Sequence, residues 1–413
     1  MTAPANGVFD IAIGGGSFAG LALALAIVRA SHTGLTVAVV DRSLPGPDPM
    51  KPDPRAFALA AGSRRLLEAI GVWPAVASEA EPVSGIDITD SDLGDFMRPL
   101  ALSYDTTLDG EPQMLILPAD TLRAALVDAV LAEPDVTLVT GSDIAGLDMA
   151  PGYGRIRLRN GDSIAGRLVV AADGARSTLR DAAGISIVGG HYGQRGIITV
   201  VSHGEEHGGR AVQHFLPGGP FAMLPLPAKR TCITWSECEA EATRILALDD
   251  VAFLAEVQLR AGWQRGELAL EGPRASWPLA THLARGLVAS RLALIGDAAR
   301  AVHPIAGQGV NLGFRDVAAL VEALADGVGL GLEAGDVTIL ERYERWRRAD
   351  GTQAAMAFSA LNALFSNTSR PLRAVRTAGL GLVDRLPGVK EMLVREAAGT
   401  TGLPPKLLTG GTL

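Results

Sequence analysis

Residues 11–27 read "IAIGGGSFAGLALALAI", which indicates an apolar strand, a glycine-rich turn and the start of a helix of small and apolar residues. The glycines fit a dinucleotide fingerprint in two registers, and neither register completes G-x-G-x-x-G. The two candidate triplets are Gly14, Gly16 and Ala19, or Gly15, Ser17 and Gly20. The stretch therefore predicts the strand–turn–helix of a dinucleotide-binding fold but leaves the phosphate-binding register open.

The next apolar stretch selects one register. "LTVAVVDR" at 35–42 predicts a second strand that ends at Asp41. Asp41 follows Gly20 by twenty-one residues, the distance at which dinucleotide folds place the acid that binds a ribose hydroxyl. This spacing favours Gly15, Ser17 and Gly20, with the phosphates at the helix N-terminus, where backbone N–H groups attract anions. Taken alone, the stretch also fits a turn that only packs a strand against a helix.

Length and composition favour a two-lobed α/β enzyme. The chain has 413 residues, beyond the size at which a single core usually stops growing, and 48% of them are hydrophobic. A net charge of -8 gives no general reason to bind nucleic acid. Cys232 and Cys238 form no disulfide framework and the histidines lack metal-ligand spacing, so we expect no metal and a cytoplasmic protein. The uncharged run 11–28 lacks the basic flank of a signal peptide and predicts a buried element.

Periodicity divides the rest of the chain between two lobes. Helical patterns cover 55–73, with Arg55 at the start, and 119–131, whereas alternating strands dominate 185–280. We expect a nucleotide-binding lobe made of 1–74, 101–184 and 283–345. We expect a second lobe with a mixed sheet to comprise 75–100 and 185–282, and a helical region to cover 346–413.

Two further predicted strands end at an aspartate. "VVAADGARSTLR" at 169–180 predicts a buried strand that stops at Asp173. "LALIGDAARAVHPIAGQGVNLGFRDVAAL" at 292–320 predicts another that stops at Asp297, and its "GQGVN" segment opens a long helix. Ligands of open α/β sheets bind outside the carboxyl ends of the strands, so both aspartates are candidates for the same site as Asp41.

Together these motifs resemble the flavin-dependent aromatic hydroxylases, and within them the UbiH/UbiF/COQ6 branch that hydroxylates ubiquinone precursors. "HPIAGQGVNLGFRD" at 303–316 matches the signature of that branch, and "HYGQRGIITVV" and "FLPGGPFAMLPL" look like it as well. The resemblance extends from residue 8 to about residue 410. It implies an α/β fold similar to that of p-hydroxybenzoate hydroxylase, with a GR2-type, Rossmann-like FAD-binding domain, a mixed β-sheet substrate domain and a helical C-terminal tail.

The resemblance also implies where FAD binds. The glycine-rich turn would hold the pyrophosphate, Asp41 the adenosine ribose and Asp297 the ribityl chain. Backbone N–H groups at 309–311 would donate to the N1–C2=O edge of the flavin, which is anionic when reduced. The full implied set is Gly15, Ser17, Gly20, Asp41, Arg42, Arg55, Asp173, Asp297, Gly307, Gln308, Gly309, Val310 and Asn311. Two positions depart from the family, because Ser17 replaces a glycine and Arg300 replaces the more frequent histidine.

The implied reaction is the hydroxylation of a polyprenylated phenol by molecular oxygen. NADH or NADPH, bound transiently without a second Rossmann motif, would reduce FAD, and a flavin C4a-hydroperoxide would transfer one oxygen atom to the ring. The sequence assigns no catalytic residue. Pro304 beside the flavin, and Tyr192 and His214 on the substrate lobe, are candidates for shaping the site or for helping the phenol to lose its proton. An ordinary structural role stays open for each of them.

Three other functions stay open as well: hydroxylation of a soluble aromatic, reduction of a prenyl chain on the same fold, and an accessory role without catalysis among other quinone-biosynthesis proteins. Residues 370–396 alternate apolar and basic side chains at roughly helical intervals. This pattern fits a peripheral contact with the inner face of the membrane that collects a polyprenyl substrate. It fits equally well a helical cap with a solvated charged face.

Overall fold

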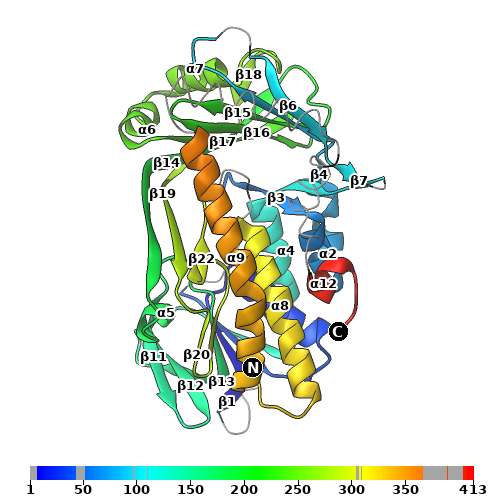
Figure 1. Ribbon diagram of the computed structural model, residues 1–413, viewed down its shortest axis with the longest axis vertical. Helices are drawn as coiled ribbons and strands as arrows, with labels where there is room; N and C mark the ends of the chain where they lie inside the picture. Colours follow the sequence, from blue (N-terminus) through cyan, green and yellow to red (C-terminus); the bar gives the residue numbers. More distant parts are fainter. Residues whose placement is uncertain are drawn as a thin grey trace.

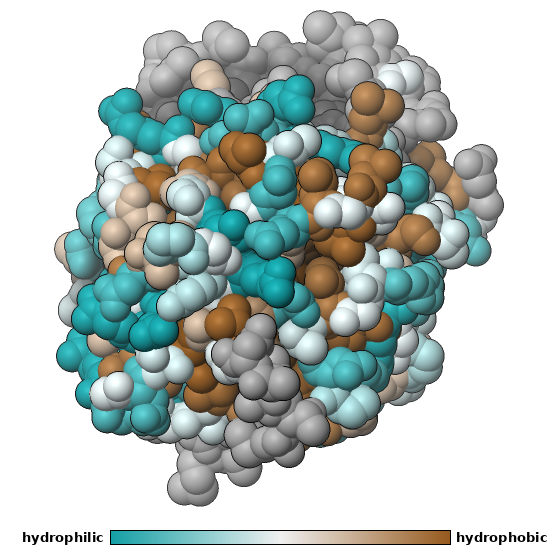
Figure 2. Space-filling view, turned by 90° about the horizontal axis from the view of Figure 1, so that it is seen from below, coloured by the Kyte–Doolittle hydropathy of each residue, from teal (hydrophilic) through white to brown (hydrophobic). Residues whose placement is uncertain are grey.

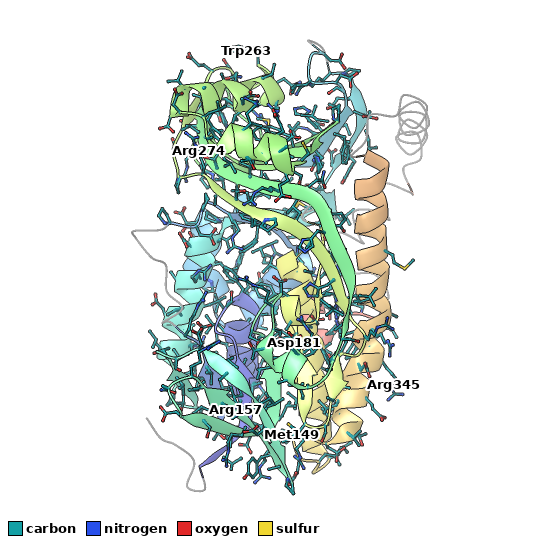
Figure 3. The ribbon with its side chains drawn as sticks, turned by 90° about the vertical axis from the view of Figure 1, so that its left-hand side faces the viewer. Met149, Arg157, Asp181, Trp263, Arg274 and Arg345 are labelled. Carbon is teal, nitrogen blue, oxygen red and sulfur yellow. The ribbon has the colours of Figure 1, made fainter. Side chains whose placement is uncertain are left out.

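The computed structural model describes residues 7–42, 52–95, 98–108, 110–303, 307, 309–365, 388 and 403–413. Two large sheets occupy the two halves of an elongated molecule, and the chain passes between them several times (Figure 1). Trp263 marks the outer end of one half, and Met149 and Arg157 mark the outer end of the other (Figure 3). The chain therefore folds into two lobes, each with one of the large sheets.

The first sheet has the order β10-β2-β1-β13-β12-β11, with β21 beside β13 and β20 beside β21. Its central strands β10, β2, β1, β13 and β21 pair in parallel, and β12, β11 and β20 add antiparallel edges. The bounds are β1 (Val8–Gly14), β2 (Val37–Val40), β10 (Val136–Val139), β11 (Ile144–Ala150), β12 (Tyr153–Leu158), β13 (Ser163–Ala171), β20 (Val288–Ala289) and β21 (Leu292–Leu294). Parallel strands are buried on both faces, which explains their continuous apolar runs.

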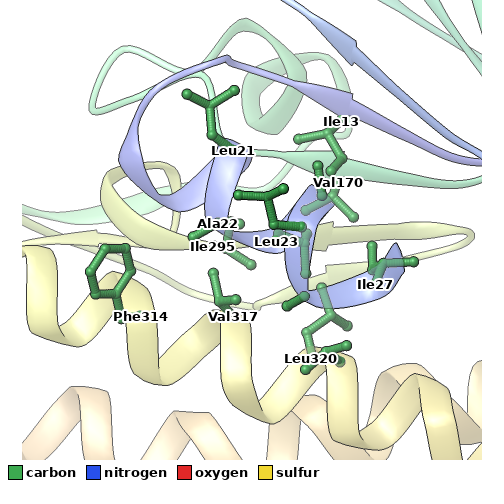
Figure 4. Close-up of a cluster of buried hydrophobic side chains, with 14 of the residues drawn as sticks. Ile13, Leu21, Ala22, Leu23, Ile27, Val170, Ile295, Phe314, Val317 and Leu320 are labelled. Carbon is green, nitrogen blue, oxygen red and sulfur yellow. The ribbon is translucent and has the colours of Figure 1, made fainter. Parts of the chain in front are cut away.

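Helices cover the first sheet. α1 packs against α4 and α8, and α8 packs against α9. Leu23 of α1 meets Ile13 and Val170 of the sheet and Val317 and Leu320 of α8 in a cluster without solvent exposure (Figure 4). Burial of each such leucine stabilises the fold by about 1.5–3 kcal/mol. The bounds are α1 (Phe18–Leu25), followed by the π-helical turn η1 (Ala26–Ala30), α4 (Ala119–Leu131), α8 (Gly309–Gly329) and α9 (Val337–Phe365).

The second sheet has the order β22-β19-β14-β17-β16-β15-β5-β6, with β18 beside β14. β14 is 17 residues long and, with β19, reaches from this sheet toward the first one (Figure 1). Helices α6 and α7 cover the outer face. The bounds are β5 (Gly85–Asp90), β6 (Leu100–Asp105), β14 (Ile187–His203), β15 (Arg210–Leu216), β16 (Gly219–Leu226), β17 (Arg230–Cys238), α6 (Glu239–Leu246), α7 (Asp250–Ala261), β18 (Leu268–Leu270), β19 (Ala275–Ala284) and β22 (Arg300–Ala301).

The predicted helix over 55–73 is wrong in its first part. Residues Ala56–Ala60 form strand β3, and the helix α2 begins only at Ala61 and ends at Ala69. β3 pairs with the distant strand β9 (Met114–Pro118), and this pairing overrides the local helical periodicity. Arg55 therefore precedes a strand and does not start a helix. β4 (Glu81–Pro82) completes this three-stranded sheet between the lobes.

Short elements complete the described chain. They are α3 (Trp73–Val76), η2 (Ala77–Glu79), β7 (Thr107–Leu108), β8 (Glu111–Pro112), α5 (Thr178–Ala182), η3 (Gly296–Ala298) and α12 (Lys406–Thr409). Hydrophilic and hydrophobic residues are interspersed on the end of the first lobe (Figure 2). None of the helices in the described ranges is both long and apolar enough to cross a membrane. The predicted interfacial segment 370–396 lies outside the described residues apart from Gly388.

Candidate active site

The glycine-rich turn after β1 has close backbone contacts at Gly15 and Gly20, two positions of the later register. Gly15 has a φ of +111°, and a Cβ there would lie 2.2 Å from the carbonyl oxygen of Ala172. A Cβ on Gly20 would lie 1.9 Å from the carbonyl oxygen of Gly15. The Ser17 side chain precedes α1 but accepts no capping hydrogen bond. The backbone N–H groups of the first turn of α1 are thus left without a side-chain cap, as an anion-binding helix N-terminus requires.

Asp41 lies beside this turn. Its Oδ2 atom accepts a hydrogen bond of 2.7 Å from the backbone N–H of Gly16. The end of β2 therefore places a carboxylate next to the end of β1, as the spacing between Gly20 and Asp41 predicts. Arg42 follows and is exposed, and its carbonyl oxygen accepts from the N–H of Gly141.

Asp173 organises the turn after β13. Its carboxylate accepts from the Ser177 hydroxyl and from the backbone N–H of Leu179, and burial raises its pKa. Arg180 in the following helix donates to the carbonyl oxygen of Ala298 with an N–O distance of 3.2 Å. The Asp173 and Asp297 motifs, separate in the sequence, are therefore joined directly through Arg180.

Asp297 lies just after β21, in the short turn η3. Its side chain is accessible to solvent, yet desolvation raises its pKa, while His282 and Arg55 act in the opposite direction. Solvent accessibility and a pKa raised by desolvation are both expected for a carboxylate that has protein atoms on one side and solvent on the other. Within the described residues no side chain donates a hydrogen bond to this carboxylate, so a bound hydroxyl group would find a free acceptor there.

Arg55 supplies the positive charge on the same side. It forms an ion pair of 2.5 Å with Asp53, and the charge of Asp297 also acts on it. Its guanidinium lies 5.8 Å from the ring centroid of Phe57 and 5.9 Å from that of Trp277. Arg55 therefore connects the first lobe with a strand of the second.

The loop that leads into α8 approaches β3. Gly307 has a φ of +61°, and a Cβ there would lie 3.2 Å from the Cβ of Ala58. Gly309 begins the helix and is exposed, while Val310 is partly buried against the core. The predicted site residues Pro304 and Gln308 lie outside the described residues.

The side chain of Asn311 has a role that the sequence did not reveal. Its Nδ2 donates to the carbonyl oxygen of Ala58, and its Oδ1 accepts from the N–H of Ala60 and the hydroxyl of Ser63. β3 is an edge strand, so this fully buried amide occupies the place that the next strand would take. Asn311 thereby fixes the first turn of α8, and only its backbone is left to face a ligand.

Tyr192 and His303 lie together. Their rings meet edge to face with centroids 4.9 Å apart, and His303 is only 1% exposed. Neither ring nitrogen of His303 has a hydrogen-bond partner among the described residues, and burial lowers its pKa to about 4. The imidazole is therefore neutral near pH 7.

The second sheet presents a wall of small side chains toward the first lobe. Directly paired residues share a face, so Gly196, Ser236 and Pro220 form one row and Ala222 and Thr234 belong to the next. Trp277 and Phe215 end the first row, and Gln213 and Ile198 flank the second. Ile198 packs with Ala58 and Ile116 of the three-stranded sheet, which shows that this face is the inner one. We call these residues the inner wall.

His214 lies on the opposite face of the same sheet. Its ring stacks on Phe221 with centroids 6.4 Å apart, and its Nδ1 is 2.7 Å from the hydroxyl of Thr89. Phe221 belongs to the cluster that α6 and α7 cover. Burial lowers the pKa of His214 to about 4. His214 therefore does not lie on the inner wall. Its neighbour Gln213 does, although the sequence did not single it out.

The chain combines a two-lobed fold with a glycine-rich turn after β1, three aspartates at strand ends and a helix N-terminus beside β3. These features are typical of a flavoprotein of the hydroxylase type. The family model described as FAD binding domain matches residues 9–358, and the chain belongs to this family. It is an FAD-dependent monooxygenase.

Relatives extend along nearly the whole chain. The ubiquinone hydroxylase UbiL of Rhodospirillum rubrum is 37% identical over 99% of this chain and 95% of its own length. The 3-demethoxyubiquinol 3-hydroxylase of Escherichia coli is 32% identical over 94% of this chain and 98% of its own length. The crystal structure of p-nitrophenol 4-monooxygenase PnpA from Pseudomonas putida has a TM-score of 0.78 at 19% identity and covers 96% of this chain and 99% of that one. This structural likeness confirms the fold.

Proposed function

We propose that the protein hydroxylates the aromatic ring of a polyprenylated phenol in ubiquinone biosynthesis, with NADH or NADPH as electron donor and molecular oxygen as the second substrate. The observation that carries the aromatic substrate is the inner wall, where the small side chains of Ala222 and Ser236 lie in the rows between Phe215 and Trp277. The quinone class follows from the names of the two relatives that span the chain.

The described residues fit FAD. Gly15 and Gly20 allow the tight turn between β1 and α1, and the uncapped N-terminus of α1 would supply the N–H donors for a pyrophosphate. Asp41 would hold the adenosine ribose. The carboxylate of Asp297, which accepts no side-chain hydrogen bond among the described residues, would hold the ribityl hydroxyls, with Arg55 balancing its charge. When bound, FAD activates dioxygen and delivers one oxygen atom to the ring.

The two lobes have different roles in the proposed reaction. Residues 1–74, 101–184 and 283–345 hold the cofactor, while the inner wall on 185–282 orients the phenol and excludes water. Gln213 is the polar contact in this wall, because its Nε2 atom is buried without a hydrogen-bond partner among the described residues. It would donate to an oxygen of the substrate. The neutral imidazole of His303 and the phenol of Tyr192 shape the entrance near the flavin loop, and Pro304 would lie beside the ring.

The proposal includes a contact between residues 370–396 and the membrane. A polyprenyl tail partitions into the bilayer, and basic and apolar side chains alternate over 370–396. We place the protein at the inner face of the membrane through this segment, together with other quinone-biosynthesis proteins.

The test reduces the FAD-loaded protein anaerobically with NADH or NADPH and then adds oxygen and a short-chain prenylphenol. We expect one hydroxylated product per oxygen consumed, identified by mass spectrometry. Reduction of the prenyl chain without oxygen would assign the reductase function instead, and rapid hydroxylation of soluble phenols only would assign the soluble-aromatic alternative. Absence of reduction by either nucleotide would leave the accessory role.

Variants of the wall connect this chemistry to the structure. Ala222→Phe fills the inner wall, and Gln213→Leu removes its polar contact, so both should raise KM for the phenol while FAD content stays unchanged. Phe221→Leu, one residue away on the outer face, is the matched control and should leave KM unchanged. Equal KM values for Ala222→Phe and the parent protein would contradict the assignment of the wall.

A further inference from the structure

The turn that carries the Asp297 carboxylate is held by groups from outside the turn. The carbonyl oxygens of residues 297, 298 and 299 each accept a hydrogen bond from another element. The three pairs are His282 Nε2 with Asp297, Arg180 Nη1 with Ala298, and the backbone N–H of Ala284 with Ala299. The backbone that positions the Asp297 carboxylate is therefore fixed at three consecutive peptide groups.

His282 bonds to the very residue that carries the carboxylate. Its Nε2 atom lies 2.8 Å from the carbonyl oxygen of Asp297. A carbonyl oxygen only accepts hydrogen bonds, so Nε2 carries the proton in this pair. His282 is 7% exposed, so the donor is shielded from exchange with water. The bond therefore fixes the peptide group that follows the Cα atom of Asp297, and with it the direction of the side chain.

The imidazole of His282 acts as a neutral donor. Burial lowers its pKa, and the positive charge of Arg180 acts in the same direction. The hydrogen bond to the Asp297 carbonyl and the charge of Asp297 oppose this shift without reversing it. At pH 7 His282 thus supplies a directed N–H group and no full charge. A neutral amide of the right length can take its place.

Strand β19 brings His282 to this turn. β19 belongs to the second sheet and reaches toward the first one (Figure 1). Its register pairs His282 with Gly189 of β14 on one side and with Ala301 of β22 on the other. A Cβ on Gly189 would lie 2.6 Å from the Cα atom of His282. Directly paired residues share a face, so only small residues lie in line with the imidazole on the neighbouring strands.

We propose that His282 is a positioning residue of the FAD site. Its Nε2–H group holds the backbone of Asp297 so that the carboxylate meets the ribityl hydroxyl groups of the cofactor. This inference rests on the proposed function, which assigns the ribityl chain to Asp297. It adds a residue from the second sheet to a site otherwise built from the first lobe. His282 acts through Asp297 and need not touch FAD itself.

The test dilutes the FAD-loaded, full-length protein and follows the release of flavin by fluorescence, which gives the Kd for FAD. His282→Leu removes the donor, and His282→Asn holds its amide nitrogen too close to the backbone to reach the Asp297 carbonyl. Both should raise the Kd at least tenfold. His282→Gln places an amide N–H at about the position of Nε2 and should stay within threefold of the parent protein.

Two results from these variants would overturn the proposal. One is an equal Kd for His282→Asn and the parent protein, which would show that the hydrogen bond does not matter for FAD. The other is a Kd for His282→Gln as high as that for His282→Leu, because a restored donor should restore binding.

His207→Leu is the matched control for lost stability. His207 is 8% exposed, and its Nε2 atom lies 2.9 Å from the carbonyl oxygen of Leu226 in β16. The variant removes a buried histidine–carbonyl bond of the same kind within the second lobe. It should lower the stability in urea unfolding and leave the Kd for FAD unchanged. If it raises the Kd as much as His282→Leu does, the loss of FAD reflects general destabilisation and the proposal is refuted.

Asp297→Ala separates this inference from the proposed function. Because His282 acts through the Asp297 carboxylate, His282→Asn should change the Kd less than twofold in the Asp297→Ala background. A full tenfold effect in that background would overturn the inference. If Asp297→Ala itself leaves the Kd unchanged, the assignment of Asp297 to FAD fails and the inference fails with it. If Asp297→Ala weakens FAD and His282→Asn does not, only the inference about His282 fails.

Discussion

Replacement of Asn311 by alanine removes the amide that closes the free edge of β3. The N–H of Ala60 and the carbonyl of Ala58 then lose their partner in a fully buried place. Each buried backbone group left without a partner costs about 1–3 kcal/mol, so Asn311→Ala should lower the free energy of unfolding by about 2–6 kcal/mol. This is a large part of the 5–15 kcal/mol by which domains are typically stable.

The effect on FAD follows from the same geometry. Asn311 fixes the first turn of α8, whose N–H groups face the flavin in the proposed site, so we expect the Kd for FAD to rise at least tenfold. Urea unfolding followed by tryptophan fluorescence measures the stability, and flavin fluorescence measures release of the cofactor. Because two lobes need not unfold together, both signals are needed.

Ser63→Ala is the matched control for this experiment. It removes the third hydrogen bond of Asn311 and leaves both backbone groups of β3 bonded. Its cost should be about 1 kcal/mol, the usual net value of one hydrogen bond. If Asn311→Ala costs no more than Ser63→Ala, the amide does not replace a strand and the reasoning fails.

Three further predictions concern other parts of the chain. Gly20→Ala places a Cβ 1.9 Å from the carbonyl oxygen of Gly15, so the purified variant should contain little FAD. Gly313→Ala, whose Cβ would have its nearest neighbour at 3.6 Å, should keep its FAD, and absorbance measures the FAD content of both variants. Burial holds the pKa of His214 near 4, so the unfolded chain binds more protons between pH 6.5 and 4 and stability falls as the pH is lowered through this range; His214→Gln should reduce that fall in thermal denaturation. Asp316→Asn leaves two buried guanidinium groups without their carboxylate and should cost about 3–5 kcal/mol in urea unfolding.

The local sequence pattern predicted an element correctly where that element depends mainly on residues close to it in the sequence. The strand–turn–helix around Gly15 and the helix Ala119–Leu131 match their predictions, because apolar periodicity and the glycine turn are properties of short segments. The spacing from Gly20 to Asp41 also located the end of β2, since it measures the length of one helix and its connections.

Long-range pairing explains what the sequence did not reveal. Ala56–Ala60 has a helical pattern but becomes a strand because β9, more than fifty residues later, pairs with it. The amide of Asn311 bonds to Ala60 across 251 positions, and the pattern of α8 carries no sign of that contact. The inner position of Gln213 and the outer position of His214 depend on strand register, which alternation alone does not assign to a face.

Two helix N-termini converge near Asp297. A Cβ on Gly313, in the second turn of α8, would lie 3.6 Å both from the Cβ of Ala19 in the first turn of α1 and from the Cα of Gly296. Asp316 accepts from the N–H of Gly296 and so ties α8 to the strand end that carries Asp297. The positive ends of α1 and α8 are therefore held against one another by close backbone packing.

The first turns of α1 and α8 contain no acidic residue, a property that they share with α2 and α9. α4, α6 and α7 carry Asp120, Glu239 and Asp250 in the first turn, where an acid stabilises the helix dipole. α1 and α8 have no acidic residue there. A carboxylate at either end would have neutralised the partial positive charge and repelled phosphate. Its absence from α1 and α8 leaves both termini open to anionic groups of a ligand, which would be the pyrophosphate and the reduced flavin in the proposed FAD site.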